Sequence, residues 1–169
     1  MPEIPTITVL IDTREQKPLL FPSTLRWRGK LWQIKTVKRK LDSGDYSIMI
    51  DGKLQPVGVE RKSGIVELRK NFSKADYSRF LRALKRLAKS YKHPILALEG
   101  TPSSLLRPTK DIPDPAAVVQ HILWECRRLC IEVVLIGECH LPATRRNAGT
   151  FLLFFMLSCL DKPLAGSVE

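Results

Sequence analysis

Asp45 lies at one end of a mostly apolar stretch, and Glu60 and Lys62 lie at its other end. The stretch contains Asp51-Gly52, a dipeptide typical of tight β-hairpins. A two-residue turn would make the two acids diagonal neighbours, and a four-residue loop would place them directly opposite each other. Side chains alternate between the faces of a sheet, so both registers put the acids and Lys62 on one face. Only an odd loop or a bulge would separate them.

Two neighbouring carboxylates repel each other by about 1–4 kcal/mol, depending on the dielectric, unless a cation or a shared proton relieves the repulsion. Mg²⁺ binds one or two carboxylates and keeps waters for a phosphate substrate. Asp45 and Glu60 therefore indicate a Mg²⁺ or Mn²⁺ site, where Lys62 would orient or deprotonate the attacking water. The alternative is a turn capped by Asp45 and a solvated strand end with weak ion pairs.

The order Gly-Asp, a variable stretch and then 59-VERKS-63 resembles the signature of the XPF family of structure-specific endonucleases, GDXnERKX3D, a variant of the PD-(D/E)xK nuclease motif. The stretch 9-VLIDTRE-15 is also similar to the first strand of that family, which ends in Asp-x-Arg-Glu. The resemblance covers residues 7–136. It implies a restriction-endonuclease-like fold and metal-dependent hydrolysis of phosphodiester bonds.

The resemblance also implies roles for single residues. The implied catalytic residues are Asp45, Glu60, Lys62, Asp12 and Arg61. The three acids among them would bind the metal, Lys62 would assist the nucleophile, and Arg14 and Arg61 would contact phosphate or brace the acids. The last acid of the signature falls at Val66 in this chain. Either Glu67, one residue later, replaces it as a metal ligand, or that ligand is missing.

The charge of the chain suits a polyanionic partner. There are 28 Lys and Arg against 17 Asp and Glu, a formal net charge of +11, and neutralising phosphates releases counterions. The candidate DNA-binding residues are Arg14, Arg26, Arg28, Lys30, Lys70, Lys74 and Arg79. Trp27 and Trp32 lie in the same short region as Arg26, Arg28 and Lys30, and they would stack on exposed bases of branched or partly single-stranded DNA. Packing in the core is the alternative for each ring.

Hydrophobic periodicity predicts the elements that position these residues. The predicted strands are 7–11, 31–40, 46–50, 57–59, 95–98 and 131–136. The predicted helices are 64–92, which the segment 71–73 would split in two, 115–130 and 150–160. The alternation slips between Ile34 and Val37, which leaves room for a bulge. This order favours an α/β fold, a restriction-endonuclease-like core with a central mixed β-sheet flanked by helices.

Length and composition favour one globular domain over residues 1–169, without the C-terminal helix-hairpin-helix module that members of the XPF family usually carry. The chain start lacks a signal-peptide pattern, and the most apolar stretch, 151–160, is too short to span a bilayer. No membrane association is expected. We expect an intracellular protein, cytoplasmic and nucleoid-associated if prokaryotic or viral, and nuclear if eukaryotic. The spacing of Cys126, Cys130, Cys139 and His140 does not favour a zinc site.

The sequence therefore predicts a Mg²⁺- or Mn²⁺-dependent DNA endonuclease acting at branched, flap or junction DNA in repair, recombination or replication. One alternative is a non-catalytic DNA-binding or partner subunit with a nuclease-like fold, which the valine in the acid position would permit. Another is a sequence-specific nuclease of restriction type. The stretch 151–160 is apolar nearly all round, which suits either a buried central helix or an interface with a second copy or a protein partner.

Overall fold

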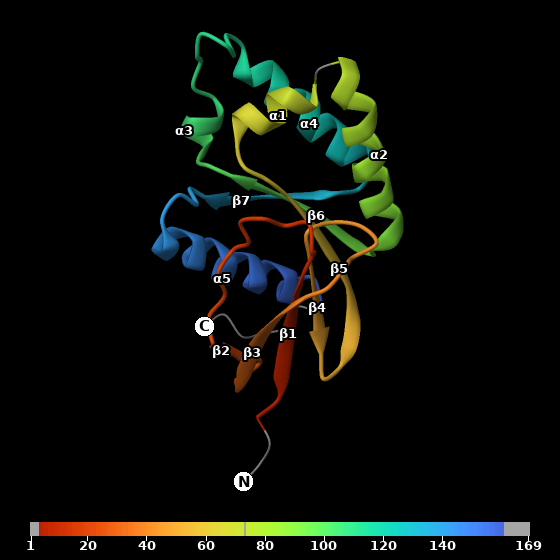
Figure 1. Ribbon diagram of the computed structural model, residues 1–169, viewed down its shortest axis with the longest axis vertical. Coiled ribbons are helices and arrows are strands. Elements are labelled where there is room, and N and C mark those ends of the chain that lie inside the picture. Colours follow the sequence, from red (N-terminus) through yellow and green to blue (C-terminus); the bar gives the residue numbers. More distant parts are fainter. Residues whose placement is uncertain (1–3, 73, 161–169) are drawn as a thin grey trace, which may run out of the picture.

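The computed structural model describes residues 4–72 and 74–160, so residues 1–3, 73 and 161–169 of the expected domain lie outside the described residues. The described residues form a seven-stranded sheet with the order β2-β3-β1-β4-β5-β6-β7 (Figure 1). The strands are β1 (Thr6–Ile11), β2 (Thr24–Trp27), β3 (Lys30–Lys38), β4 (Tyr46–Ile50), β5 (Lys53–Lys62), β6 (His93–Glu99) and β7 (Glu132–Gly137). The helices are α1 (Ile65–Asn71), α2 (Lys74–Ser90), α3 (Pro102–Leu105), α4 (Pro115–Arg128) and α5 (Pro142–Ser158).

The sheet is mixed, as predicted. β1 pairs with β3 in parallel, and so do β5 with β6 and β6 with β7, whereas the other neighbours are antiparallel. The sheet twists strongly, so β7 runs across the view of Figure 1 while β1 runs along it. Because β5 and β6 are parallel, their carboxyl ends meet at the same edge, and Lys62 lies beside Leu98 there.

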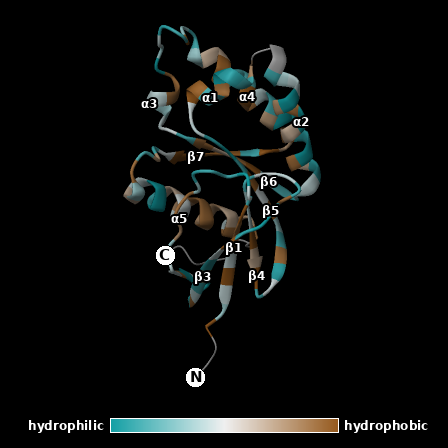
Figure 2. Cartoon of the chain, in the orientation of Figure 1, coloured by the Kyte–Doolittle hydropathy of each residue, from teal (hydrophilic) through white to brown (hydrophobic). Residues whose placement is uncertain are grey.

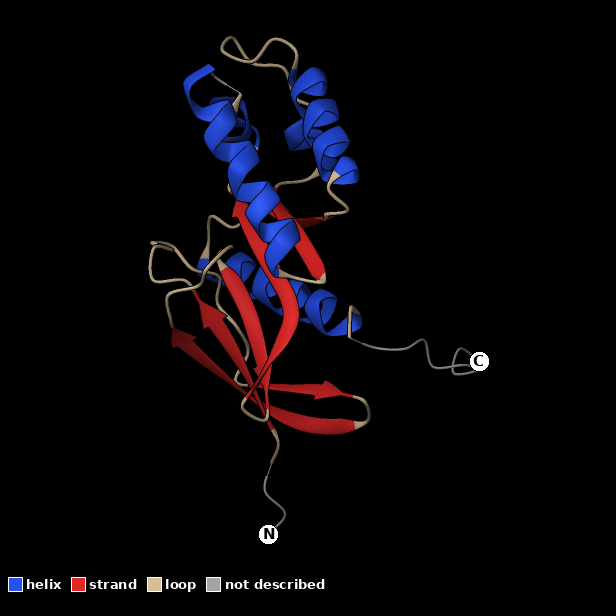
Figure 3. Cartoon of the chain, turned by 90° about the vertical axis from the view of Figure 1, so that its right-hand side faces the viewer, coloured by secondary structure: helices blue, strands red, loops and turns tan. Residues whose placement is uncertain are grey.

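Helices cover both faces of the sheet. The continuously apolar sequence of β6 follows from this, because β6 is buried on both sides. Ile95 and Ala97 belong to the core on the α5 side, whereas Leu96 and Leu98 pack with α1, α2 and α4. A strand buried on both faces has no polar side to present. Figure 2 shows apolar segments along these central strands, and Figure 3 shows helices on either side of them. No helix of the described residues is long and apolar enough to cross a membrane.

The hairpin of β4 and β5 combines the two registers that the sequence allowed. Near the Asp51-Gly52 turn Ile50 pairs with Lys53, but at the far end Tyr46 pairs with Val59. The register changes because residues 55–57 of β5 lie opposite residue 48 alone, an insertion of two residues. An even insertion preserves the face of every later side chain. The bulge therefore leaves Asp45 and Glu60 on the same face.

Four local predictions need correction. β2 and α3 were not predicted, because each is only four residues long. α5 begins at Pro142 rather than 150, since its first turns are polar and carry no apolar period; Pro142 at the first helical position was the available signal. β3 pairs with β1 in an unbroken register, so there is no bulge after Ile34. The alternation of apolar and polar residues breaks at Val37 because this apolar side chain lies on the exposed side of β3, where it is 45% exposed.

Asp12 joins the end of β1 to the loop after β3. Its Oδ1 accepts hydrogen bonds from the backbone N and the Nε of Arg14, at 2.9 and 2.6 Å, and its Oδ2 accepts one from the backbone N of Leu41 at 2.7 Å. The side chain is fully buried. Burial opposes ionisation, but these hydrogen bonds outweigh it and lower the pKa of Asp12 to about 2. Asp12 thus stabilises the segment that leads into the charged loop at residues 13–17.

We predict that Asp12→Asn lowers the free energy of unfolding by about 1–3 kcal/mol at pH 7, because the amide cannot accept from both Arg14 and Leu41 with the strength of a carboxylate. A carboxyl whose pKa is lower in the folded state stabilises the fold above its unfolded pKa and loses that contribution as the pH falls through its folded pKa. The wild-type advantage should therefore shrink below pH 4. Urea unfolding from pH 7 to pH 2.5 measures it, with exposed Asp42→Asn as the control. A difference between wild type and Asp12→Asn that is independent of pH would contradict this account.

Candidate active site

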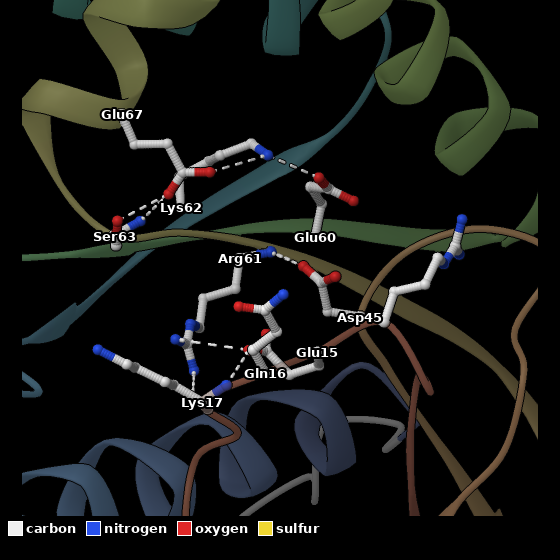
Figure 4. A pocket seen from close by; sticks show the side chains of 10 residues that line it. Glu15, Gln16, Lys17, Asp45, Glu60, Arg61, Lys62, Ser63 and Glu67 are labelled. Atoms are coloured by element: carbon white, nitrogen blue, oxygen red, sulfur yellow. Dashed lines mark hydrogen bonds and ion pairs between the residues drawn. The ribbon is translucent and has the colours of Figure 1, made fainter.

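The charged ends of the hairpin meet in an open cavity of about 300 Å³ (Figure 4). Four segments line it: the loop after β1, the start of β4, the end of β5 and the first turn of α1. The lining residues are Arg14, Glu15, Gln16, Lys17, Asp45, Glu60, Arg61, Lys62, Ser63 and Glu67. The backbone N of Asp45 donates to the carbonyl oxygen of Val59 at 2.6 Å, which continues the β4–β5 ladder to the cavity.

Asp45 is held beside a like charge. Its Oδ2 accepts a hydrogen bond from the backbone N of Arg61 at 2.7 Å, which fixes the orientation of the carboxyl group. Burial and the charge of Glu60 nevertheless raise the pKa of Asp45 to about 7. The ionised form of this carboxyl is therefore costly here, and a cation at the cavity would favour it.

Lys62 lies between two acids. Its Nζ is 2.8 Å from Oε1 of Glu60 and 3.4 Å from Oε1 of Glu67, and its side chain is 12% exposed. Burial disfavours the ammonium form, but the charges of Glu60 and Glu67 and the hydrogen bond to Glu60 raise the pKa of Lys62. In this arrangement Lys62 is a cation that donates hydrogen bonds. Figure 4 shows its amine between the two carboxylates.

The structure brings Glu67 into the cavity and leaves Val66 outside it. Val66 is 60% exposed and does not line the cavity. Oε2 of Glu67 accepts from the backbone N and the Oγ of Ser63, at 2.7 and 2.8 Å. Gly64 precedes α1 at φ 109°, a left-handed conformation that glycine adopts without strain. This turn between β5 and α1 points Glu67 back toward Lys62.

Arg61 faces away from Glu60 and Lys62, since it alternates with them along β5. Its Nε is 2.9 Å from Oε1 of Glu99, and its Nη1 donates to the carbonyl oxygen of Lys17 at 2.8 Å. Arg61 thus joins the ends of β5 and β6 to the loop after β1. It also lines a second cavity of about 570 Å³ with Lys17, Ser63, Glu99, Cys139, His140 and Arg145.

Asp12 is absent from the cavity lining, although it was expected to bind the metal. Both of its carboxylate oxygens accept hydrogen bonds from the protein, and the side chain is fully buried. Asp12 and Asp45 both lie at strand ends, but Asp12 is held by hydrogen bonds within the protein whereas Asp45 lines the cavity. The sequence around Asp12 did not distinguish a structural role from a metal ligand. The structure supports bracing for Asp12, with Arg14 as its partner.

Several predicted DNA-binding residues lie away from the cavity. Those with described, exposed side chains are Arg26, Arg28, Lys30, Lys70 and Arg79. The first three lie at the β2–β3 edge of the sheet, and the last two lie on α1 and α2. Lys74 begins α2, but its side chain is outside the described residues. Trp32 is 9% exposed and its Nε1 donates to the carbonyl oxygen of Trp27, so Trp32 belongs to the core.

Three residues that approach the acids were not among the predicted site residues. Arg86 of α2 lines a hollow of about 230 Å³ together with Arg14, Asp45 and Glu60. On the other flank Glu15 and Lys17 line the main cavity. Arg86 is one of several basic residues in the sequence of α2, and only the packing of α2 on β5 and β6 identifies which of them reaches the acids.

The free oxygens of this cavity suit a small divalent cation. Among the described residues no protein group donates a hydrogen bond to Oδ1 of Asp45 or Oε2 of Glu60. Mg²⁺ is typically held by one or two carboxylates, with waters completing its shell. Two free carboxylate oxygens, one of them on an acid with a raised pKa, provide that ligand set.

Comparisons with known proteins identify the family and the fold of the chain. The model of the ERCC4 domain matches residues 11–129. A structure of XPF from Aeropyrum pernix has 20% sequence identity and a TM-score of 0.56, covering 90% of this chain and 68% of that one. A structure described as XPF from Aeropyrum pernix, complex with DNA, has 18% identity and a TM-score of 0.60, covering 95% and 68%. No curated protein matches the chain in sequence.

At these identities the structural likeness establishes the fold, and it confirms the predicted restriction-endonuclease-like α/β core. The family match is independent of the structural likeness and spans more than half of the 169 residues. It also includes both halves of the hairpin and the first turn of α1, which supply the acids and Lys62. The chain therefore belongs to the ERCC4-domain family, the XPF type of nuclease domain that its motifs resemble.

Proposed function

We propose that this protein is a Mg²⁺- or Mn²⁺-dependent endonuclease that hydrolyses phosphodiester bonds in branched, flap or junction DNA during repair, recombination or replication. The observation that carries the proposal is the convergence of Asp45, Glu60 and Lys62 on one cavity, with free carboxylate oxygens on both acids. Membership of the ERCC4-domain family supports it, and so does the likeness to an XPF structure described as a complex with DNA.

The residues of the cavity divide the chemistry among them. Asp45 and Glu60 would hold the metal ion, which when bound supplies an activated water and offsets phosphate charge. Lys62, protonated between Glu60 and Glu67, would donate a hydrogen bond to the attacking water or to a phosphate oxygen and stabilise the charge that develops there. The backbone N of Arg61 keeps the carboxyl group of Asp45 turned toward the cavity.

Basic residues on both flanks suggest how the nucleic-acid backbone lies across the site. Arg14 and Arg86 line the hollow on one side of the acids, and Lys17 lines the cavity on the other side. We infer that adjacent phosphates occupy these positions. The exposed residues at the β2–β3 edge and on α1 and α2 would contact more distant phosphates, whose contribution to affinity falls with salt.

A non-catalytic DNA-binding subunit is the second candidate. The amine of Lys62 already pairs with Glu60 and Glu67, so one protein cation partly compensates the acids without a metal. The valine at the acid position of the signature points the same way. DNA binding that persists without metal-dependent cleavage would support this candidate.

Cleavage assays on labelled flap, fork, junction and linear duplex DNA test the proposed activity. We expect the wild type to cut branched substrates with Mg²⁺ or Mn²⁺. Asp45→Asn and Glu60→Gln should each lower the cleavage rate by about 100-fold or more, because each change removes a charged ligand. Asp51→Asn in the turn of the same hairpin is the matched control, since Asp51 has φ 47° and asparagine tolerates that conformation. Full activity of Asp45→Asn, or no metal-dependent cutting by the wild type, would exclude the proposal.

Exchanging the acid at the start of α1 tests whether Glu67 acts in place of the acid that the signature expects at Val66. We expect Glu67→Gln to lower the cleavage rate about tenfold or more, because the amide can still accept from Ser63 but no longer offsets the charge of Lys62 or binds a cation. Val66→Ala should leave the rate unchanged, since this side chain is exposed. Equal rates for Glu67→Gln and wild type would assign Glu67 a capping role only.

The pH dependence of metal binding follows from Asp45. A metal ion binds the ionised carboxylate, and the pKa of Asp45 is about 7 because of burial and Glu60. Raising the pH from 6 to 8 should therefore increase the affinity for Mn²⁺ about tenfold, with release of a proton at the lower pH. Calorimetric titration in two buffers of different ionisation enthalpy measures both quantities. An affinity independent of pH across this range would mean that Asp45 is not a ligand.

A further inference from the structure

A second set of potential metal ligands lies outside the cavity. His93, Glu132 and Cys159 each offer one ligand atom, and these atoms all lie within 4.8 Å of one another. Within residues 4–72 and 74–160 no other group of three His, Cys, Asp or Glu side chains meets that distance. The three residues come from three different elements, and neither the predicted nuclease site nor the four-residue zinc set weighed from the sequence includes this combination.

The fold explains how these residues meet. His93 begins β6 and Glu132 begins β7, and Glu132 pairs with Ile95. Residues 93 and 95 share a face of β6, so all three side chains lie on the face covered by α5. Cys159 follows the last residue of α5 and packs against the same core. The end of α5 thus meets the start of both parallel strands.

This cluster is separate from the candidate active site. His93 pairs with Val57 of β5, whereas Leu98 pairs with Lys62. The two sites are therefore five residues apart along β5 (57 to 62), a separation of about 17 Å. A variant in one set leaves the ligands of the other set in place.

The distances are close to those of a coordinated ion. Zinc binds cysteine sulfur at about 2.3 Å and histidine nitrogen or carboxylate oxygen at about 2.1 Å, so ligand atoms around a tetrahedral ion lie about 3.5 Å apart. Sγ of Cys159 is 4.0 Å from Oε1 of Glu132. Small side-chain rotations at this partly exposed edge would close the remaining gap. Glu132 is exposed, so its carboxylate is free to move.

The chemistry of the ligands selects the ion. Imidazole and thiolate favour borderline-soft transition metals such as Zn²⁺, whereas Mg²⁺ and Mn²⁺ prefer sites built from oxygen. We propose that His93, Glu132 and Cys159 bind one Zn²⁺ ion, with water in the fourth position, and that the ion ties the end of α5 to the starts of β6 and β7. The site does not depend on the proposed nuclease activity.

Cobalt provides the direct test, because Co²⁺ bound to a thiolate gives a charge-transfer absorption band. Protein treated with chelator should bind one equivalent of Co²⁺ with this band, and Zn²⁺ should displace it. Cys159→Ser should abolish the band. His93→Ala and Glu132→Gln should each weaken binding by more than about 100-fold, since even partners outside the coordination shell contribute about 10–100-fold to affinity.

Two controls separate this site from other metal sites. Cys130→Ser removes an exposed thiol outside the cluster and should leave the band unchanged. The double variant Asp45→Asn, Glu60→Gln should also keep the band, whether or not the protein proves to be a nuclease. In the background of this double variant, which lacks the two acids of the cavity, Zn²⁺ should raise the Tm of Cys130→Ser but not of Cys159→Ser. No cobalt–thiolate band in the wild type, or the same band in Cys159→Ser, would overturn the proposal.

Discussion

The constraint that organises the site is the placement of two partly buried carboxylates on one face of the β4–β5 hairpin. Asp45 and Glu60 face one cavity, where burial and the charge of Glu60 raise the pKa of Asp45. Two consecutive residues of β5 contact opposite sides of the site. Lys62 pairs with Glu60 on the cavity side, and Arg61 donates a hydrogen bond to the loop after β1 on the other side. Neighbouring strands and helices then have to supply acids for these bases.

Glu67 and Glu99 meet that need in different ways. Glu67 comes from the first turn of a helix and stays near Lys62 through its hydrogen bonds to Ser63. Glu99 ends β6 and pairs with Arg61. Because β6 is buried on both faces and parallel to β5, the position of Glu99 is set by the core. The charged network is thus anchored in the hydrophobic packing that surrounds it.

Sequence patterns predicted the features that depend on local period. The sequence predicted the central strands, the split between α1 and α2, and the start of α4 at residue 115. The sequence also indicated that Asp45, Glu60 and Lys62 share a face. It did not reveal that Asp12 is a buried brace or that Arg86 borders the acids, because both depend on contacts between distant segments. Four-residue elements such as β2 are too short for a period to show.

The two-residue insertion in β5 has a consequence for how this hairpin tolerates changes of length. One added or deleted residue between Asp45 and Glu60 would exchange the faces of Glu60 and Arg61, turning a base toward Asp45 and an acid toward Glu99. A change of two residues would alter only the size of the bulge or the turn. Insertions or deletions of an even number of residues between Asp45 and Glu60 are therefore compatible with the site. An odd number requires a second bulge that restores the face of Glu60.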